Sequence, residues 1–280
     1  RTKMTKLEAS AEIRSNMIDV CGTGGDKKGT YNISTAVAFF VAACGVNVAK
    51  HGNRAVSSKS GSSDVLTELG IKIDLTPEQS LQCLEQAGIS FLFAPLYHKA
   101  MKNVAPVRKD LGIRTIFNII GPLSNPALPE NQLIGVYKPE LVEQLARVLQ
   151  KLGSKNAIIA HGTEGLDEAS VCQETLISEL KNGEIKSYEV SPDQLNLQKH
   201  NIDDLTGGDS RHNASEMRLI LKGKESAYLD AVLLNSALAL KCCNAVETIE
   251  QGLEKARNAI NSGSAYEKLK KLVEVSNLFE

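Results

Sequence analysis

The chain has 280 residues, of which 42% are hydrophobic and 23% charged, proportions that are ordinary for a folded globular protein. Its 32 basic and 33 acidic side chains give a net charge of −1, so it lacks the basic excess typical of proteins that bind nucleic acid or anionic membranes. No apolar run reaches the roughly 18–20 residues of a membrane span, and the charged first 15 residues lack the apolar core of a signal peptide. The six cysteines form no C-x-x-C pair, which favours reduced thiols over a disulfide framework. We therefore expect a cytoplasmic protein without a membrane or nucleic-acid partner.

Along the chain, short apolar runs alternate with segments of helical periodicity. The expected strands cover residues 17–21, 46–50, 89–94, 132–137 and 156–161, followed by a hairpin of residues 176–180 and 185–190. The expected helices cover residues 32–44, 63–69, 77–87, 95 to about 107, 139–152 and most of the chain after residue 215. Residues 114–129, rich in proline, glycine and asparagine, are expected to be an irregular connection. This alternation predicts an α/β fold with a largely parallel sheet flanked by helices, and ligands at the carboxyl ends of its strands.

The first expected strand runs into a glycine loop, residues 22–31. Glycines at positions 22, 24 and 25 allow a sharp turn and leave backbone N–H groups open to an anion. The helix expected from Asn32 adds free N–H groups at its first turn, and Thr30, Ser34 and Thr35 add hydroxyl groups. The loop has neither the G-K-[ST] of a Walker motif nor the G-x-G-x-x-G of a dinucleotide site, and G-x-G-G alone also fits a simple hairpin.

A second polar loop, residues 50–64, follows the second expected strand. It gathers three cations (Lys50, Arg54 and Lys59), the amide of Asn53 and five serines, with little apolar content. A long loop rich in donors for oxyanions suits a phosphorylated sugar. His51 in this loop is compatible with either a structural or a catalytic role.

Together these segments resemble the anthranilate phosphoribosyltransferase family. The similar segments are DVCGTGGD (19–26), NIST (32–35), KHGNR (50–54), SSKSG (57–61), PVR (106–108), NIIGPLSNP (118–126), GLDE (165–168), Gly207-Gly208 and Asn213-Ala214. The resemblance extends over nearly the whole chain from about residue 17. It implies a parallel sheet flanked by helices with a smaller all-helical domain, and transfer of phosphoribose from phosphoribosyl pyrophosphate to the amine of anthranilate in tryptophan biosynthesis.

The resemblance also implies roles for individual residues. Those expected at phosphoribosyl pyrophosphate are Gly22, Thr23, Gly24, Gly25, Asp26, Thr30, Asn32, Ser34, Thr35, Lys50 and Ser62. Those expected at anthranilate are Gly22, His51, Asn53 and Arg108, whose guanidinium suits the carboxylate of this acceptor. Magnesium is expected at Ser34, Asp167 and Glu168, which offer hard oxygen ligands. No catalytic residue is certain, and His51 is a weak candidate for a base because an aryl amine can shed its proton after the C–N bond forms.

The resemblance further implies two domains and a homodimer. Residues 1–16 and about 95–125 are expected to form the small helical domain, and residues 17–94 and 126–280 the α/β domain. The family normally has several helices before the glycine loop, and only 16 residues precede Met17, so we expect this segment to be truncated and dimerisation to be in doubt. A pyrimidine nucleoside phosphorylase and a non-catalytic nucleic-acid-binding relative remain alternatives with the same architecture.

Overall fold

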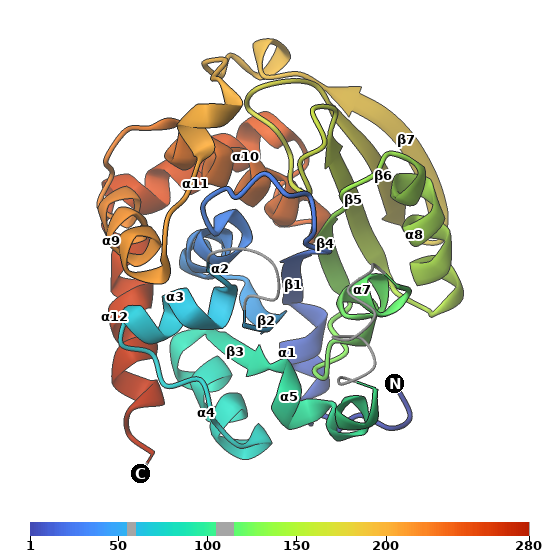
Figure 1. Cartoon of the computed structure of the whole chain (residues 1–280), viewed down its shortest axis with the longest axis vertical. Helices are drawn as coiled ribbons and strands as arrows, with labels where there is room; N and C mark the ends of the chain where they lie inside the picture. Colours follow the sequence, from blue (N-terminus) through green and yellow to red (C-terminus); the bar gives the residue numbers. More distant parts are fainter. Residues whose placement is uncertain (55–59, 105–114, 280) are drawn as a thin grey trace.

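A seven-stranded sheet forms the centre of the computed structural model, which describes residues 1–54, 60–104 and 115–279 (Figure 1). Its strands are β1 (Met17–Gly22), β2 (Asn47–Gly52), β3 (Ile89–Phe93), β4 (Asn131–Gly135), β5 (Asn156–Gly162), β6 (Thr175–Lys181) and β7 (Glu184–Val190). They lie in the order β3-β2-β1-β4-β5-β6-β7. The first five are parallel, whereas β6 and β7 pair antiparallel as a hairpin. The predicted α/β class with a largely parallel sheet is confirmed.

The sheet changes direction of winding beside its central strand. From β1 the chain moves to β2 and β3 on one side, and then returns to add β4 and β5 on the other. At the carboxyl end of this junction Gly22 of β1 is paired with Gly135 of β4. In an open parallel sheet such a switch point opens a crevice where ligands bind. The glycine loop begins at this point.

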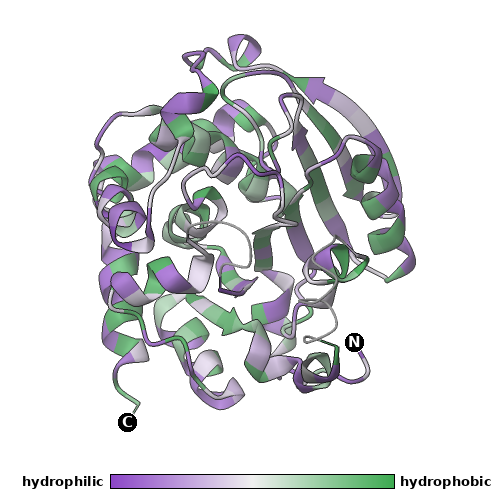
Figure 2. Ribbon diagram, viewed as in Figure 1, coloured by the Kyte–Doolittle hydropathy of each residue, from purple (hydrophilic) through white to green (hydrophobic). Residues whose placement is uncertain are grey.

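Helices cover both faces of the sheet. On one face α2 (Ile33–Ala43) and α10 (Ala227–Cys242) pack on the strands, with α9 (Ser210–Leu221), α11 (Ile249–Asn261) and α12 (Ser264–Ser276) outside them. On the other face α8 (Glu140–Lys151) packs on β5 and β6, with its hydrophobic side inward and its hydrophilic side outward (Figure 2). Because α2 and α10 are enclosed on nearly all sides, nearly all their residues are buried and their apolar residues are not confined to one face.

Near β2 and β3, α3 (Ser62–Glu68) and α4 (Pro77–Ala87) complete the covering of the sheet. Helix α4 begins as predicted, because the Thr76 side chain accepts a hydrogen bond from the Gln79 N–H and Pro77 occupies the first turn. Three other short elements are α1 (Ala11–Ser15), η3 (Asp193–Leu195) and η4 (Ile202–Leu205).

The single helix expected from residue 95 to about 107 is wrong. The described part of this segment contains α5 (Ala94–Tyr97) and the 3-10 helix η1 (Lys99–Asn103). The interruption lies at His98, whose backbone leaves helical geometry (φ −113°, ψ 58°) while its ring contacts His51. The connection expected to be irregular contains two short helices, α7 (Phe117–Ile120) and the 3-10 helix η2 (Pro122–Ser124).

The amino-terminal segment packs on these short helices. Arg1 Nε donates to the Leu123 carbonyl oxygen (2.7 Å), and the N–H groups of Thr5 and Leu7 donate to the carbonyl oxygens of Tyr97 and Pro126. These contacts place residues 1–9 beside the segment that the sequence assigns to the small helical domain. The domain boundaries themselves stay a prediction.

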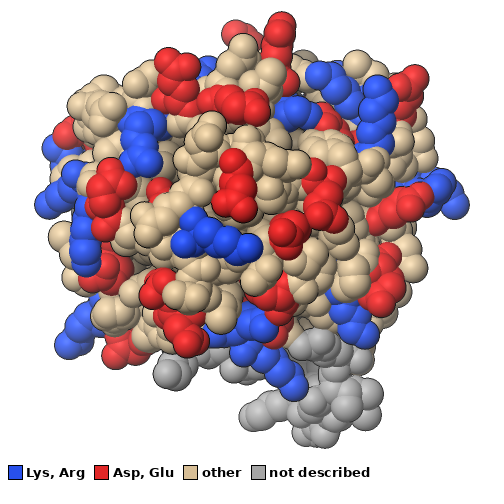
Figure 3. Space-filling view, turned by 90° about the horizontal axis from the view of Figure 1, so that it is seen from above, with Lys and Arg blue, Asp and Glu red and all other residues tan. Residues whose placement is uncertain are grey.

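Three expectations from composition can be compared with the structure. All six cysteines are free thiols. In the described parts of the chain, no helix has the length and apolar character needed to cross a bilayer. On the face shown in Figure 3, lysine and arginine side chains alternate with aspartate and glutamate, and no large area of one sign is visible.

Candidate active site

The glycine loop leaves the carboxyl end of β1 and returns to α2 through several left-handed residues. Gly24, Gly25, Lys27 and Gly29 all have positive φ angles, between 63° and 81°. Glycine tolerates this conformation without the steric cost of a Cβ atom, which explains three of the four residue types. The loop therefore folds back above the sheet within a few residues, as the sequence predicts.

An acidic segment crosses over the start of this loop. Asp167 Oδ2 accepts a hydrogen bond from the Gly24 N–H at 2.6 Å, which joins residues 143 positions apart. The approach depends on two glycines at the strand ends. A Cβ atom on Gly135 would lie 1.7 Å from the Asp167 carbonyl oxygen, and one on Gly22 would lie 2.6 Å from Asp167 Oδ2. Because Gly22 and Gly135 have no side chains, the segment that carries the acidic pair, Asp167 and Glu168, can pass over the two strand ends and reach the glycine loop.

Lys50 lies beneath the glycine loop at the end of β2. It is only 4% exposed, and its ammonium group donates to the Val20 carbonyl oxygen (2.6 Å) and to Ser34 Oγ (3.1 Å). Burial lowers the pKa of Lys50, while the neighbouring groups of Cys21, Asp19 and Glu168 oppose this effect. A buried cation is thereby held directly behind the first turn of α2.

The acidic pair itself is crowded with negative charge. Burial raises the pKa of Asp167 well above its usual value, and repulsion from Asp26 and Glu168 adds to the rise. Burial also raises the pKa of Glu168 to about 7, although Lys50 and hydrogen bonds from Ser34 oppose the shift. Three carboxyl groups from two distant segments therefore lie close enough to repel one another, and a cation between them would relieve that repulsion.

These residues do not form a complete metal centre by themselves. Within residues 1–54, 60–104 and 115–279, no three histidine, cysteine, aspartate or glutamate side chains are arranged around one point as metal ligands. The carboxylates of Asp167 and Glu168 and the hydroxyl of Ser34 are hard oxygen donors, which fit magnesium. Magnesium usually keeps several waters and substrate phosphate oxygens in its coordination shell, so it needs few protein ligands.

A pair of histidines lies at the next strand end. The backbone N–H of His51 donates a hydrogen bond to Asp19 Oδ1 (3.1 Å). The ring Nε2 atoms of His51 and His98 are 3.1 Å apart. Burial, followed by the neighbouring His98, lowers the pKa of His51 to about 3. A group with this pKa is neutral and only weakly basic at pH 7, so the geometry favours a polar contact by His51 over proton abstraction.

The sequence reasoning missed the residues that support His51. Asp19 is completely buried, and burial raises its pKa to about 6 against the opposing effects of a hydrogen bond from Asn125 and of Lys50. Asn125 also donates to the Ala49 carbonyl oxygen at 2.8 Å. A buried aspartate in an apolar strand was a visible signal in the sequence. His98 carried no such signal, because it stands in a segment that reads as helix.

Other predicted site residues lie around the same edge. Asn53 is exposed, with its Oδ1 accepting from the Arg54 N–H (2.8 Å), and Ser62 Oγ donates to the Asn53 carbonyl oxygen (3.1 Å). The Thr23 N–H donates to the Gly135 carbonyl oxygen, whereas Thr35 is 1% exposed. Arg108 lies outside the described residues, as do residues 55–59 of the second loop.

A further segment, residues 198–208, runs along the outer side of the glycine loop and is called the strap here. The Gly207 N–H donates to the Gly29 carbonyl oxygen (2.9 Å), and the Tyr31 N–H donates to the Leu205 carbonyl oxygen (3.0 Å). Thr30 and Thr206 form an antiparallel bridge between them. The predicted ligand Thr30 is therefore held by the strap.

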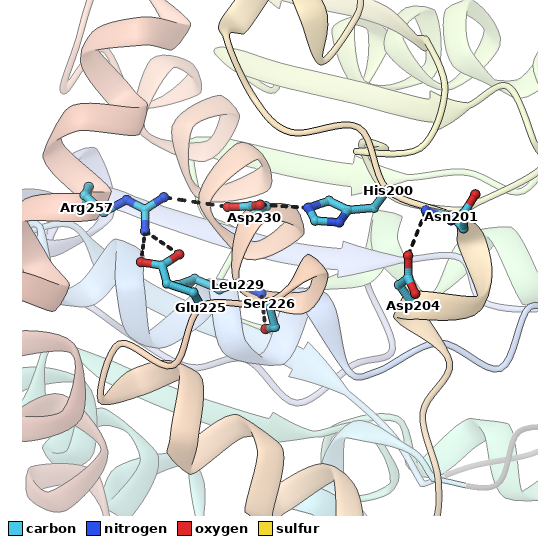
Figure 4. A network of polar contacts seen from close by, with 8 residues as sticks. All are labelled: His200, Asn201, Asp204, Glu225, Ser226, Leu229, Asp230 and Arg257. Atoms are coloured by element: carbon cyan, nitrogen blue, oxygen red, sulfur yellow. Dashed lines mark hydrogen bonds and ion pairs between the residues drawn. The ribbon is translucent and has the colours of Figure 1, made fainter.

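The strap is tied to the helical layer by a polar network (Figure 4). His200 Nε2 lies 2.8 Å from Asp230 Oδ2 on α10, and both side chains are less than 15% exposed. Asp230 in turn faces Arg257 of α11, which also forms an ion pair with Glu225. The network anchors one end of the strap, and its pairing with the glycine loop holds the other.

The chain is similar in sequence to known proteins over most of its length. Residues 14–266 match the profile described as "Glycosyl transferase family, a/b domain". The chain is 49% identical to the anthranilate phosphoribosyltransferase of Rhodopseudomonas palustris over 276 residues, which are 99% of this chain and 80% of that protein. It is 50% identical to the enzyme of the same name from Persephonella marina over 271 residues, 96% of this chain and 80% of that protein.

Solved structures of the same enzyme share the fold. The Thermus thermophilus enzyme superposes with a TM-score of 0.88 at 39% identity, covering 94% of this chain and 78% of the other. The Saccharomyces cerevisiae enzyme in complex with PRPP and Mg superposes with a TM-score of 0.91 at 27% identity, covering 99% and 77%. Given this similarity in sequence and in fold, the chain belongs to the anthranilate phosphoribosyltransferase family of glycosyltransferases.

Proposed function

We propose that this chain transfers the phosphoribosyl group of phosphoribosyl pyrophosphate to the amine of anthranilate, giving N-(5-phosphoribosyl)anthranilate and pyrophosphate. The observation that carries the proposal is the convergence at one edge of the sheet of the glycine loop, the buried cation Lys50 and the acidic pair Asp167-Glu168. The amino end of a helix and a cation suit phosphate oxygens, and the carboxylates suit a metal ion that accompanies a diphosphate.

Within this proposal the phosphate groups bind at the glycine loop. The positive end of the α2 helix dipole and the ammonium group of Lys50 supply partial and full positive charge beside this loop. As the C1–O bond breaks, its electron pair passes to the departing pyrophosphate. Fixed donors that face the growing negative charge lower the barrier because they need no reorganisation during the reaction.

Magnesium is proposed at the acidic pair. Asp167, Glu168 and the hydroxyl of Ser34 would hold it, and the repulsion that raises the pKa values of both carboxyl groups would be relieved by a divalent cation. When bound, the ion supplies charge neutralisation for the diphosphate. Asp26, which lies close to Asp167, is proposed to face the ribose hydroxyl groups or the metal rather than a phosphate.

The acceptor is proposed to bind beside β2. Gly22, the neutral His51 and Asn53 would face the anthranilate ring, and Arg108 would pair with its carboxylate. The amine nitrogen attacks C1 of the ribose, the new C–N bond forms on the face opposite the departing oxygen, and the extra proton on nitrogen then passes to water. No protein base is assigned, because an aryl ammonium is acidic enough to lose this proton unaided.

The test is loss of anthranilate fluorescence in the presence of phosphoribosyl pyrophosphate and Mg²⁺. We expect Asp167→Asn and Glu168→Gln to raise the Mg²⁺ concentration needed for half-maximal rate, with Glu143→Gln on the exposed face of α8 as the charge-matched control. No turnover by the wild-type protein would refute the proposal. Phosphate-dependent release of uracil from uridine would favour the nucleoside phosphorylase, and tight binding of labelled DNA or RNA would favour the non-catalytic relative.

Assembly and location stay predictions. The homodimer expected from the resemblance is tested by sedimentation of the purified protein, and the cytoplasmic location by fractionation. The division into a small helical domain (residues 1–16 and about 95–125) and an α/β domain is tested by limited proteolysis, which would cut between them.

A further inference from the structure

The backbone ladder between β1 and β2 ends early in the sheet that the structure describes. Its paired residues are Met17 with Asn47 and Ile18 with Val48. Five residue pairs join β1 to β4 and five join β2 to β3, in both cases up to the last residue of the strands. The carboxyl ends of β1 and β2, where the two polar loops begin, thus lack backbone pairing to each other.

A side chain replaces the backbone partner at the point where the ladder stops. Before this point the Asn47 N–H donates to the Asn16 carbonyl oxygen (2.9 Å), and in a parallel ladder the pattern repeats at every second residue of each strand. Two repeats further on, the His51 N–H would donate to the Val20 carbonyl oxygen. It donates instead to Asp19 Oδ1 at 3.1 Å. The carboxylate of β1 therefore takes the place of a carbonyl group of β1.

Two more side chains bind carbonyl groups of the same strand ends. The Val20 carbonyl oxygen accepts from the Lys50 ammonium group (2.6 Å), and the Ala49 carbonyl oxygen accepts from Asn125 Nδ2 (2.8 Å). The orientation of the Asn125 amide is fixed, because its Oδ1 accepts from the Ala127 N–H, which can only donate. Lys50 and Asn125 are at most 4% exposed, so water does not compete for these bonds. Side chains thus bind backbone groups of both strands where the ladder is interrupted.

Among these side chains, Asp19 fixes the end of β2 relative to β1. A buried N–H group is costly without an acceptor, and for His51 the acceptor is the Asp19 carboxylate. Without that oxygen the N–H would have its ladder partner, the Val20 carbonyl, as the alternative, and reaching it would draw the end of β2 toward β1. His51 and Asn53, proposed beside anthranilate, lie at and just after this strand end. Their separation from Gly22 at the end of β1 therefore depends on Asp19.

We propose that Asp19 is a positioning residue for anthranilate: its carboxylate replaces a ladder acceptor between β1 and β2 and so sets the distance between Gly22 and residues 51–53, which face this substrate. The inference rests on the proposed function. Because Asp19 is completely buried, it acts through the backbone of His51 rather than by contact with anthranilate.

The test compares two variants of similar shape. Asp19→Leu and Asp19→Asn both remove the negative charge, which also acts on Lys50, but only asparagine keeps an oxygen for the His51 N–H. In the fluorescence assay we expect KM for anthranilate to be about tenfold higher in Asp19→Leu than in Asp19→Asn, the size of one lost hydrogen bond. The affinities of the two variants for phosphoribosyl pyrophosphate, measured by calorimetry with Mg²⁺, should agree within about twofold, because Lys50 keeps its bonds to Val20 and Ser34. Equal KM values, or a parallel loss of affinity for phosphoribosyl pyrophosphate, would overturn the proposal.

A matched control lies at the other end of β1. The buried Asn131 Nδ2 donates to the Met17 carbonyl oxygen at 2.9 Å, so here too a side chain binds the backbone of a neighbouring strand. Asn131→Leu should lower the melting temperature but leave KM for anthranilate unchanged. If it raises this KM as much as Asp19→Leu does, the effect is a general loss of stability and the proposal is wrong.

A second variant covers the case in which Asp19→Leu does not fold. If Asp19→Leu gives no cooperative thermal transition, Asp19→Ala replaces it, since alanine also removes the acceptor oxygen and the same difference from Asp19→Asn is expected. A wild-type protein without turnover refutes the proposed function. Equal KM values for anthranilate in folded variants of an active protein refute the role of Asp19 alone.

Discussion

The close approach of the acidic pair to the ends of β1 and β4 gives a sharp prediction for Gly135→Ala. The added Cβ atom would lie 1.7 Å from the Asp167 carbonyl oxygen, whereas real Cβ contacts under 3.0 Å are essentially never seen. The segment carrying Asp167 and Glu168 must therefore move by more than an ångström. A displacement of this size in a positioning group costs about 100-fold in rate, so we expect kcat/KM to fall by about that factor.

The same substitution at Gly252 separates this effect from a general loss of stability. A Cβ atom on Gly252, in α11, would lie 2.7 Å from the backbone Cα of Ala237 in α10 and would not touch Asp167. An added methyl group in a tightly packed site lowers the free energy of unfolding by about 1–3 kcal/mol, so both variants should have a lower melting temperature. Only Gly135→Ala should lose activity in the fluorescence assay and require more Mg²⁺. Equal kcat/KM values for the two variants would refute the reasoning.

Three other predictions follow from buried groups. Lys50→Met should destabilise the fold by about 3–5 kcal/mol in urea titrations, because it leaves the Asp19 and Glu168 carboxyl groups without their cation, and it should weaken binding of phosphoribosyl pyrophosphate. The pKa of Asp19 is about 6 in the folded state and 3.8 in the unfolded state, so the native state binds more protons between these pH values. The free energy of unfolding should therefore fall as the pH rises from 3.8 to 6, by at most about 3 kcal/mol. Urea titrations across this pH range should show the loss in the wild-type protein and not in Asp19→Asn. His200→Ala should lower the free energy of unfolding by about 1–3 kcal/mol and speed proteolysis within the strap, because Asp230 loses one of its two partners. Cleavage of the strap at the wild-type rate would contradict its anchoring by His200.

Much of the fold, and the position of the two polar loops at the strand ends, could be predicted from local sequence. Periodicity placed the strands and long helices, since a strand buried on both faces and a helix of 3.6-residue period leave distinct patterns of apolar residues. The glycine loop was predicted because positive φ angles require glycine at specific positions, and the donor-rich loop after Lys50 because its side-chain chemistry is visible in the residue types. The exception was the helix expected after Pro95, where His98 leaves helical geometry in contact with a ring 47 positions earlier in the chain.

What only the tertiary structure decided is which distant groups meet and how they are oriented. In the sequence, Asp167 and Glu168 look like part of an ordinary polar loop. Only the structure shows that their segment passes over the strand ends at Gly22 and Gly135, where a side chain would block it. The neutral state of His51 depends on burial beside His98, and the orientation of the Asn32 side-chain amide depends on Asn213. Residue types and spacing thus determined the chemistry that the chain can offer. Protonation states and hydrogen-bond directions depend on burial and on partners far along the chain, so they came only from the fold.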